Sequence, residues 1–498
     1  MSQLTSEQIA AGEARSILPG ENLEVVEGWG RASNSVAYVF RPSTFDEVRS
    51  VFELARQSGR TVAFRGAGRS YGDAALNAEN AVLDLTQLNR ILAWDPAEGT
   101  ITLEPGVTIR QLWEYVLPHG WWPPVVPGTM YPTLGGCLAM NIHGKNNYRE
   151  GPIGDHVTEF DLLLPNGDLK RCSRTENVEL FDAAIGGFGI LGCFTRITLR
   201  MKRVYSGLLN VEAITARSLD HMMEIFERRA AGADYLVGWI DALAGGSHVG
   251  RGVIHAANYL ANGDDPHPER TLRVESQQLP DRILGLLPKS MLWRLMRPFM
   301  NNAGVRIVNS LKYHAGALLD RRRVVRQSHV AFAFLLDYVP NWKQAYGPGG
   351  LIQYQSFIPR GHAADVFRRQ LVLAQEAGFP PYLAVFKRHR ADRFLMTHGV
   401  DGYSLALDFR ITPRNRRAIW DLAAQLDEIV LAAGGRFYFA KDSTLQAQSV
   451  EQYLGSEAVD RFMRLKRECD PEGILETNLY RRLFGARAGD EASFRGER

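Results

Sequence analysis

The chain has 498 residues, of which 45% are hydrophobic and 23% are charged, so a folded globular protein of two or three domains is expected. The formal net charge is only +3, which argues against a general nucleic-acid binder. The four cysteines are far apart, so we expect no disulfide framework, no metal site and a cytoplasmic location. No apolar run approaches the roughly 18 residues that cross a membrane, and the N-terminal segment lacks the apolar core of a secretory signal.

The N-terminal third of the chain alternates between predicted helices and strands. An amphipathic helix is expected from Ser43 to Gly59, because overlapping capping-box patterns at its start and a glycine at its end are typical helix boundaries. A buried strand is expected at 61–64 and is followed by a glycine-rich loop at 65–77. Two further strands are expected at 81–88 and 100–109, and a helix at 108–120. This alternation indicates an α/β or α+β fold.

The central segments are more varied. Residues 123–145 are rich in Gly and Pro and end in a helix of small residues. A hairpin is predicted around Asn166 and Gly167, and a strand follows at 193–201. The pattern of the sequence changes near Met201, where a second domain is expected to begin.

Glycine-rich segments recur in the first 200 residues, at 65–73, 128–136, 143–144 and 186–189. The first follows a predicted strand, but its spacing is GxGxxxG rather than the GxGxxG of NAD-binding folds, so a Rossmann NAD site is disfavoured. Backbone N–H groups that no Cβ obstructs can form concavities that bind a pyrophosphate. The recurrence therefore indicates an extended, phosphate-bearing cofactor.

Several motifs, in the same order along the chain, resemble the FAD domain of the vanillyl-alcohol-oxidase/PCMH flavoprotein superfamily. They are RGxGRSYGD at 65–73, EPGV at 104–107, PGTxxxTxGGxxAxxxHGKN at 127–146 and GGFGILG at 186–192. Later segments are similar to members that act on decaprenylphosphoryl ribose in cell-wall biosynthesis: 345–359, 383–389, 402–409 and 434–443. The resemblance implies an α+β fold of two domains, a PCMH-type FAD-binding domain and an inserted antiparallel-sheet substrate (cap) domain.

The resemblance also implies domain boundaries. They are a first FAD-binding part at 15–207, the cap domain at 208–435, a C-terminal return that completes the FAD domain at 436–485, and a flexible tail at 486–498.

The resemblance assigns FAD binding to the two main glycine-rich loops and to one tyrosine of the returning segment. The residues are Arg65, Gly66, Ala67, Gly68, Arg69, Ser70, Tyr71, Gly72, Asp73, Gly128, Thr129, Thr133, Gly135, Gly136, Asn141, His143, Gly144 and Tyr438. Relatives that tether FAD covalently carry a histidine where this sequence has Arg69 and a cysteine where it has Tyr131. Both nucleophiles are missing, so non-covalent FAD is expected.

The chemistry that the resemblance implies is oxidation of a secondary alcohol of a sugar or polyprenylphosphoryl sugar, with hydride transfer to flavin N5. Lys441 matches the active-site lysine of the family; a desolvated lysine can accept a proton or stabilise an alkoxide, and both roles stay open. His143 and Tyr71 complete the expected catalytic set. The expected substrate contacts are Lys145, Gln353, Gln355, Lys387 and Ser404.

Simpler interpretations stand beside these roles. Gln353 and Gln355 alternate along a strand and therefore face one side of it, but they could equally form the polar face of an amphipathic strand. His143 could be a core histidine with satisfied hydrogen bonds. The family carries a cysteine where this chain has Ala406 and an amide where it has Ser404, so resistance to thiol-directed inhibitors is expected and the sugar acceptor is open.

Residues 281–326 form a local basic region. Ten Lys or Arg and two Asp give it a net charge of +8, against −5 for the rest of the chain. Apolar residues alternate with these charges, and two interpretations are open. The region could contact the inner face of a membrane at its surface, or it could form a helix whose apolar face lies in the core and whose basic face is solvated.

Other functions remain open. The resemblance implies a short-chain dehydrogenase epimerase as a partner. The alternatives are a soluble aldonolactone or alditol oxidase that uses oxygen, and a flavin-free binding protein that kept the fold.

Overall fold

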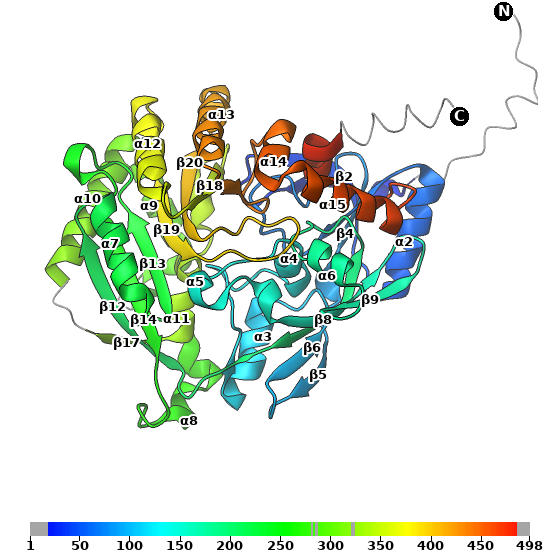
Figure 1. Cartoon of the computed structure of the whole chain (residues 1–498), viewed down its shortest axis with the longest axis horizontal. Helices are drawn as coiled ribbons and strands as arrows, with labels where there is room; N and C mark the ends of the chain where they lie inside the picture. Colours follow the sequence, from blue (N-terminus) through cyan, green and yellow to red (C-terminus); the bar gives the residue numbers. More distant parts are fainter. Residues whose placement is uncertain (1–17, 280–281, 284–286, 320–323, 486–498) are drawn as a thin grey trace, which may run out of the picture.

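The computed structural model describes residues 18–279, 282–283, 287–319 and 324–485, which form two parts that pack side by side (Figure 1). The expected flexible tail at 486–498 lies outside these residues. The larger part of the apolar core is continuous between the two parts. Helices and antiparallel sheets are both present, so the expected α+β class is confirmed.

The first part contains a small sheet with the strand order β1-β2-β4-β3. Its strands are β1 (Leu23–Glu27), β2 (Asn34–Phe40), β3 (Val62–Arg65) and β4 (Ala81–Asp84). Helix α2 (Phe45–Ser58) connects β2 to β3 and has the predicted boundaries. Thr44 Oγ1 accepts a hydrogen bond from the N–H of Glu47, and Gly59 ends the helix in the left-handed region. The glycine-rich loop therefore begins where β3 ends.

A second sheet of the first part has the order β5-β6-β10-β8-β9 and is antiparallel. Its strands are β5 (Ile91–Asp95), β6 (Thr100–Leu103), β8 (Val157–Leu163), β9 (Leu169–Ser173) and β10 (Cys193–Arg200). The turn at Asn166 and Gly167 joins β8 to β9, so the predicted hairpin is confirmed. The helices between these strands are α3 (Ile109–Val116), α4 (Leu134–Ala139), α5 (Asn147–Glu150) and α6 (Val178–Ala184).

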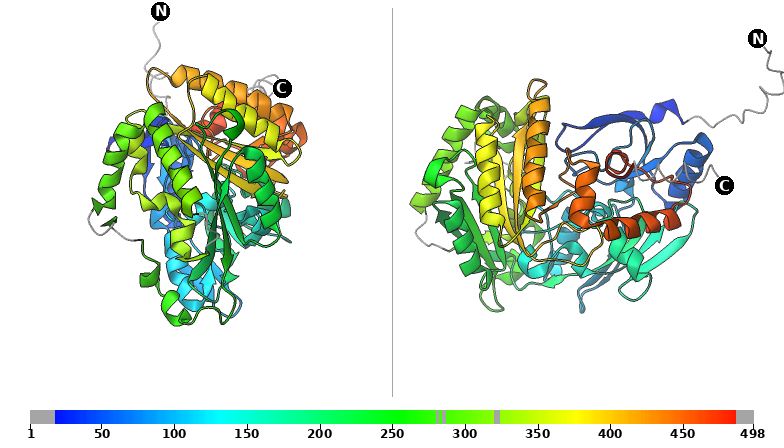
Figure 2. Two further views of the ribbon diagram at one scale, coloured as in Figure 1. Left: turned by 90° about the vertical axis from the view of Figure 1, so that its left-hand side faces the viewer. Right: turned by 45° about the horizontal axis from the view of Figure 1, so that its top comes forward.

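The second part is built on an antiparallel sheet with the order β17-β12-β14-β13-β19-β20-β18-β21. Its strands are β12 (Leu208–Ala216), β13 (Tyr235–Ile240), β14 (Gly252–Tyr259), β17 (Val325–Ser328), β18 (Leu351–Pro359), β19 (Leu383–His389), β20 (Gly402–Arg410) and β21 (Arg436–Phe437). Helices on it are α7 (Leu219–Ala230), α10 (Asn302–Leu319), α12 (Ala363–Glu376) and α13 (Arg416–Ala432). Figure 2 shows these helices standing along the sheet.

The two faces of this sheet have different neighbours. Phe386 of β19 packs its ring against Phe226 of α7 and Phe367 of α12, with centroids 5.0 and 5.8 Å apart. Residues of opposite parity face the other way, toward the first part and α10, because side chains alternate along a strand. Lys312 of α10, for example, lies with its ammonium 4.0 Å from the ring centroid of Trp239.

The remaining regular elements are short or C-terminal. They are β7 (Trp121–Trp122), β11 (Lys202–Arg203), α8 (Pro268–Thr271), β15 (Arg282–Ile283), β16 (Leu287–Pro288), α9 (Leu292–Met296), α11 (His329–Ala333), α14 (Ala447–Leu454) and α15 (Ser456–Cys469). No helix in the described part of the chain is long and apolar enough to span a lipid bilayer.

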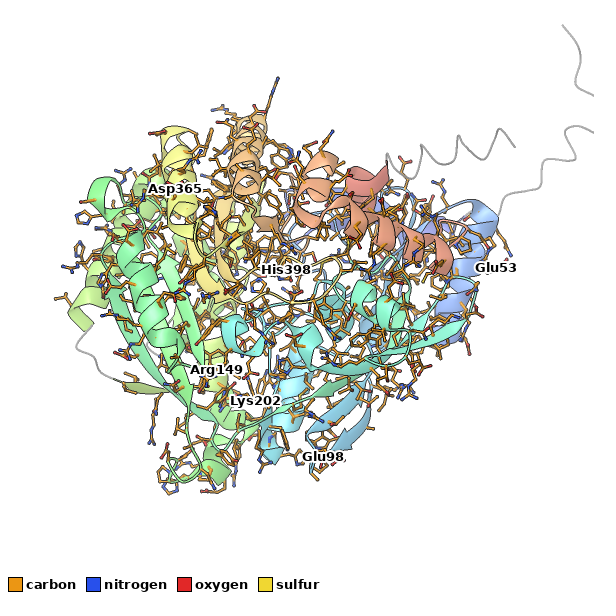
Figure 3. The ribbon with its side chains drawn as sticks, viewed as in Figure 1. Glu53, Glu98, Arg149, Lys202, Asp365 and His398 are labelled. Atoms are coloured by element: carbon orange, nitrogen blue, oxygen red, sulfur yellow. The ribbon has the colours of Figure 1, made fainter. Side chains whose placement is uncertain are left out.

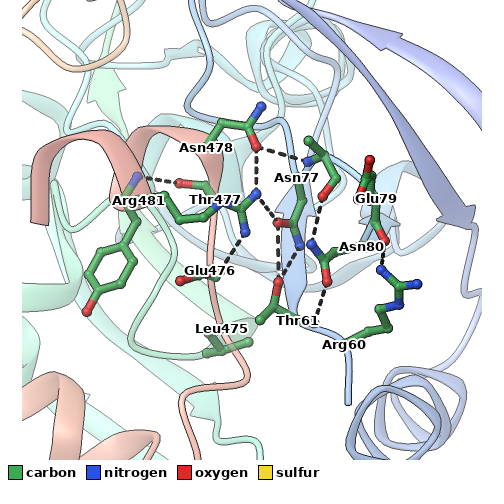
Figure 4. A network of polar contacts seen from close by, with 12 residues as sticks. Arg60, Thr61, Asn77, Glu79, Asn80, Leu475, Glu476, Thr477, Asn478 and Arg481 are labelled. Atoms are coloured by element: carbon green, nitrogen blue, oxygen red, sulfur yellow. Dashed lines mark hydrogen bonds and ion pairs between the residues drawn. The ribbon is translucent and has the colours of Figure 1, made fainter. Parts of the chain in front are cut away.

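After β21 the chain returns to the first part, where the N–H of Tyr71 donates to Ala440 O at 2.8 Å, and the segment after α15 completes this return (Figure 4). The N–H of Val62 donates to Ile474 O at 2.7 Å, and the N–H of Glu476 donates to Val62 O at 2.9 Å. Arg481 Nη2 donates to Asn77 Oδ1 at 2.8 Å. The C-terminal segment therefore runs beside β3, next to the start of the glycine-rich loop.

Arg482 fastens this return to the glycine-rich loop. Its guanidinium donates to both carboxylate oxygens of Asp73, at 3.0 and 2.7 Å. It also donates to Asp442 Oδ2 at 2.8 Å and to Leu445 O at 2.6 Å. The Asp73 carboxylate is held by Arg482, because the returning segment brings a cation against it; the expected contact of Asp73 with the cofactor stays a prediction.

We predict that Arg482→Ala lowers the free energy of unfolding by about 3–5 kcal/mol, because it leaves the largely buried carboxylates of Asp73 and Asp442 unpaired. Urea unfolding of the holoprotein measures this change. The matched control is Arg49→Ala, which breaks an exposed ion pair with Asp46 on α2 and should cost much less. Equal losses in the two variants would show that the clamp contributes no more than a surface pair.

Candidate active site

A cavity of about 730 Å³ lies between the two parts of the molecule. One wall consists of the two glycine-rich loops, at 64–75 and 126–145. The opposite wall consists of residues from β12, β13, β14, β18, β19 and β20, with α10 at one end and the turn 438–441 at the other. The cavity is therefore built from segments that lie far apart in the sequence.

Most of the predicted site residues line this cavity. They are Arg65, Gly66, Ala67, Gly68, Arg69, Ser70, Tyr71, Gly128, Thr129, Thr133, Gly135, Gly136, His143, Lys145, Gln353, Gln355, Lys387, Tyr438 and Lys441. Ala406, at the position of the cysteine of the family, lines it as well. The structure therefore brings together residues from five separate segments.

Five predicted residues do not line the cavity. They are Gly72, Asp73, Asn141, Gly144 and Ser404. Gly72 lets the returning segment approach, since a Cβ there would lie 1.9 Å from Asp442 O. Asn141 Oδ1 instead accepts a hydrogen bond from the N–H of Gly154, at 3.1 Å. Gly72 and Asn141 therefore shape the loops from behind, whereas Ser404 lies in β20.

The loop after β3 offers an anion-binding surface. Gly66 permits its close contact with the second loop, because a Cβ there would lie 2.0 Å from Thr133 Oγ1. The Arg69 guanidinium lies between the rings of Trp29 and Tyr131, with centroids 4.1 and 4.9 Å away. Its Nε is buried and has no hydrogen-bond partner among the described residues. A free buried donor beside an open backbone loop fits a diphosphate such as that of FAD.

The far end of the loop meets Lys441. The Lys441 ammonium lies 3.9 Å from the ring centroid of Tyr71, whose buried hydroxyl has no partner among the described residues. Burial lowers the pKa of Lys441, and the nearby carboxyl of Asp408 acts in the opposite direction. Burial likewise raises the pKa of Asp408, although a hydrogen bond of 2.5 Å from Gln353 Nε2 and the charge of Lys441 oppose this. Within the described residues no hydrogen bond or ion pair joins the two groups, so each shifts the pKa of the other through its charge alone.

The alternation along β18 is as predicted. Gln353 and Gln355 both face the cavity, while Tyr354 points to the opposite side and donates to Asp427 of α13 at 2.9 Å. Gln353 lies directly opposite Asp408 on β20, and Gln355 lies opposite Ala406. The alternative of a solvent-facing polar strand is wrong, since both glutamines are buried.

A chain of hydrogen bonds orients Gln355. Asn147 Oδ1 accepts a hydrogen bond from the backbone N–H of Arg390 at 3.3 Å, so this atom is the oxygen of the amide. His389 Nδ1 lies 3.0 Å from the same oxygen and must therefore carry a proton and donate it. His389 Nε2 then accepts from the Ser404 hydroxyl at 2.7 Å. Ser404 Oγ in turn accepts from Gln355 Nε2 at 3.2 Å. The expectation that Ser404 contacts substrate is corrected here: its hydroxyl is used by Gln355 and His389.

His143 is surrounded by other rings of the site. Its ring centroid lies 4.9–5.4 Å from those of Phe357, His389, His398 and Tyr438. Figure 3 shows His398 near the middle of the molecule, where the two parts meet. Burial and the charge of Lys387, whose Nζ is 3.5 Å from Nδ1, hold the pKa of His143 well below its usual range. His143 is therefore a neutral imidazole at the cavity wall.

Lys145 has a partly structural role. Its ammonium donates to the carbonyl oxygens of Phe332 at 2.8 Å and of Ala333 at 2.5 Å, both in α11. Burial and the charge of Lys387 lower its pKa to about 7. Lys145 therefore binds the second part to the second glycine-rich loop and keeps one donor for the cavity.

Sequence reasoning missed several residues of the site. They are Trp29, Asn147, His255, Lys312, His389 and Asp408. Asp408 carried a usable signal, since a lone acidic residue near the end of the apolar run GYSLALDF needs a buried partner. The other missed residues come to the site through the order of neighbouring strands and the position of α10, and the sequence alone predicts neither.

Comparison with known proteins agrees with this geometry. Residues 36–173 match the model of a FAD binding domain. The chain is 30% identical over 465 residues to the decaprenylphosphoryl-beta-D-ribose oxidase of Mycolicibacterium smegmatis, covering 92% of this chain and 96% of that protein. The chain belongs to the PCMH/VAO family of FAD-dependent oxidases. As in that family, the cofactor is FAD, and the protein is an FAD-dependent oxidoreductase.

Two further relatives show the breadth of this oxidase family. An uncharacterized protein in the mprA 5' region of Streptomyces coelicolor is 30% identical over 76% of this chain and 100% of its own length. The L-gulonolactone oxidase of Bos taurus is also 30% identical, but over only 32% of this chain and 36% of its own.

Proposed function

We propose that this oxidase acts on a secondary alcohol of a sugar carried by a polyprenyl phosphate, such as decaprenylphosphoryl ribose. The observation that carries the proposal is the shape and chemistry of the cavity. Beyond Lys441 and Gln355 the lining passes three basic residues, Lys387, Lys312 and His255, and is otherwise apolar. This apolar arm is lined by Ala213, Val237, Trp239, Val253, Ala315, Gly316, Leu383 and Val385. A prenyl chain would bury its apolar surface there, whereas a free lactone or polyol would leave the arm unfilled.

FAD is proposed to lie along the glycine-rich loops without a covalent tether. The backbone of 66–70 and the guanidinium of Arg69 would hold the diphosphate, with Tyr438 and Tyr71 beside the ring system. When bound, FAD supplies the acceptor for a hydride from the substrate carbon. Arg69 and Tyr131 stand at the two tethering positions of relatives, so the histidine and the cysteine that form the flavin bond there are both missing.

Lys441 is proposed to be the base that takes the hydroxyl proton. Burial favours its neutral amine, which can accept a proton, and the carboxyl of Asp408 then stabilises the resulting ammonium. The amide of Gln355 is held by Ser404 through its nitrogen, so its carbonyl oxygen is left to accept a hydrogen bond from a sugar hydroxyl. His143, as a neutral ring, can bind a further hydroxyl.

A short-chain dehydrogenase epimerase is proposed as the partner enzyme. Oxidation of a secondary alcohol leaves a ketone, and reduction of that ketone from the opposite face would invert the carbon.

A second function is a soluble aldonolactone or alditol oxidase that uses oxygen. The similarity to L-gulonolactone oxidase favours it, although that similarity covers only a third of the chain. The same Lys441 and Asp408 chemistry would serve either substrate.

The two functions are separated by anaerobic bleaching of the bound flavin with a substrate panel. We expect bleaching by a polyprenylphosphoryl ribose and little by aldonolactones or free alditols. Acid precipitation of a separate sample of the holoprotein should release the flavin into the supernatant, because FAD is expected to be bound without a covalent bond. Bleaching by the lactone or the polyol alone would instead support the second function.

Lys441→Met should lower the rate of flavin reduction by about 10²–10⁴-fold, since it removes the base. In the wild type the rate should rise with pH through about 7 and then level off, because burial lowers the pKa of Lys441 to about 7 and its neutral form is active. Asp408→Asn should move this midpoint to lower pH, because the carboxyl opposes the lowering. Stopped-flow absorbance of the flavin measures the rate of the Lys441→Met variant, the pH profile of the wild type and the midpoint of the Asp408→Asn variant. A rate that falls with rising pH would mean that Lys441 acts as a cation instead.

A membrane contact is proposed for the outer side of α9 and α10. The apolar side chains there are half or more exposed: Leu295, Phe299, Ile307, Leu311 and Leu318. The alternative in which the apolar face of this region lies in the core is wrong for these residues. An apolar face with Arg294 and Arg297 beside it suits an anionic bilayer.

We predict that the wild type sediments with anionic liposomes at low salt and that the double variant Leu311→Asp/Leu318→Asp binds several-fold less, since charge is added to the inserting face. Leu169→Asp, at an equally exposed leucine of β9, is the matched control and should sediment like the wild type. Absence of wild-type binding at both low and high salt would refute the contact.

A further inference from the structure

The cavity is lined by positive charge without a matching negative charge. Among its described lining residues there are six Lys or Arg and two His, but no Asp or Glu. Arg65 and Arg69 belong to the loop assigned to the FAD diphosphate. The charge of Asp408 acts on Lys441, and Lys145 has two carbonyl oxygens. His143 is a neutral ring whose two nitrogens lie against Gln355 and Lys387. The basic groups that remain are Lys387, Lys312 and His255.

These three groups surround one point of the large sheet, at Val237 on β13. His255 of β14 is the cross-strand partner of Val237. On the other side, Gly238 pairs with Phe386 of β19, so Lys387 is the residue next to Val237. Neighbouring strands are about 4.8 Å apart, so both side chains can reach a group that lies above Val237.

Lys312 completes the arrangement from above. Its ammonium lies 4.0 Å from the ring centroid of Trp239, which is two residues from Val237 and on the same face of β13. Lys312 keeps exposed surface, yet the protein around it lowers its pKa to about 8 by desolvation, as expected for a side chain that faces a cavity. Two strands and one helix therefore direct basic groups at the same place.

The charge state of these groups favours an anion. Burial lowers the pKa of Lys387 to about 8, so it and Lys312 are mostly protonated at neutral pH. Burial, followed by the charges of Lys312 and Lys145, lowers the pKa of His255 to about 4, so it is a neutral N–H donor. Two ammonium groups that face one cavity without a carboxylate repel each other, and a bound phosphate would offset that repulsion.

We propose that Lys387, Lys312 and His255 form a phosphate-binding subsite above Val237, which holds the phosphate that joins the sugar to the prenyl chain. The subsite lies between the Lys441 end of the cavity and the apolar arm at Val253 and Gly316. It rests on the proposed function and adds the residues that distinguish a phosphorylated substrate from a neutral one.

Binding of farnesyl phosphate and of farnesol to the holoprotein, measured by calorimetry, tests the subsite without turnover. The wild type should bind the phosphate more tightly than the alcohol. Lys312→Met should weaken binding of farnesyl phosphate about tenfold to a hundredfold and leave farnesol unchanged, because only the phosphate contacts the ammonium. Lys312→Arg should retain most of the affinity.

The matched control is Arg306→Met, which removes a charge from the exposed side of the same helix and should not change either affinity. Val237→Asp is a second variant; a carboxylate at the centre of the three bases should abolish binding of farnesyl phosphate. Flavin content and the melting temperature establish that each variant is folded. Equal effects of Lys312→Met and Arg306→Met, or equal wild-type affinity for the two probes, would overturn the subsite.

The outcome separates the subsite from the proposed function. If farnesyl phosphate binds as described but no polyprenylphosphoryl sugar bleaches the flavin, the subsite stands and the proposed function fails. If such a sugar does bleach the flavin and Lys312→Met leaves its KM unchanged, the function stands and the subsite is overturned.

Discussion

Positive charge buried between the two parts of the molecule is the constraint on which the site depends. An ammonium group taken out of water is stable only when oxygen atoms or an opposite charge replace its hydration. The protein meets this need from within at Lys145, through backbone carbonyls, and partly at Lys441, where the charge of Asp408 favours the ammonium form. It leaves Lys387 and Lys312 without such partners among the described residues. An anionic ligand in the cavity would supply the missing opposite charge and thereby stabilise the folded protein.

The features that could be predicted from the sequence are those whose causes are local. The ends of α2 follow from Thr44 and Gly59, and the β8–β9 hairpin follows from Asn166 and Gly167. The shared face of two glutamines on β18 follows from strand alternation alone. The glycine-rich loops could also be placed at the cavity, because backbone that must approach a ligand closely excludes a Cβ.

The features that could not be predicted depend on contacts between distant segments. Asp73 was expected at the cofactor, but Arg482, more than 400 residues later, holds its carboxylate. Ser404 lies on the cavity side of β20, yet His389 of the neighbouring strand takes its hydroxyl. Neither partner is marked by a sequence pattern, because strand order and the C-terminal return decide which groups meet. A polar residue on the correct face can therefore support a ligand-contacting residue without touching the ligand.

Helix α10 carries apolar residues both at the cavity and at the surface. Ala315 and Gly316 line the arm of the cavity, while Leu311 and Leu318, one turn away from Ala315 on the same helix face, are exposed. A soluble enzyme for small polar substrates has no use for either surface, and the outer one would promote aggregation. A prenyl chain longer than the arm must leave the cavity beside this helix, where its apolar surface would meet water unless a bilayer covers it. The proposed substrate, an anionic sugar lipid that stays partly in the membrane, would account for the exposed face and the apolar arm together.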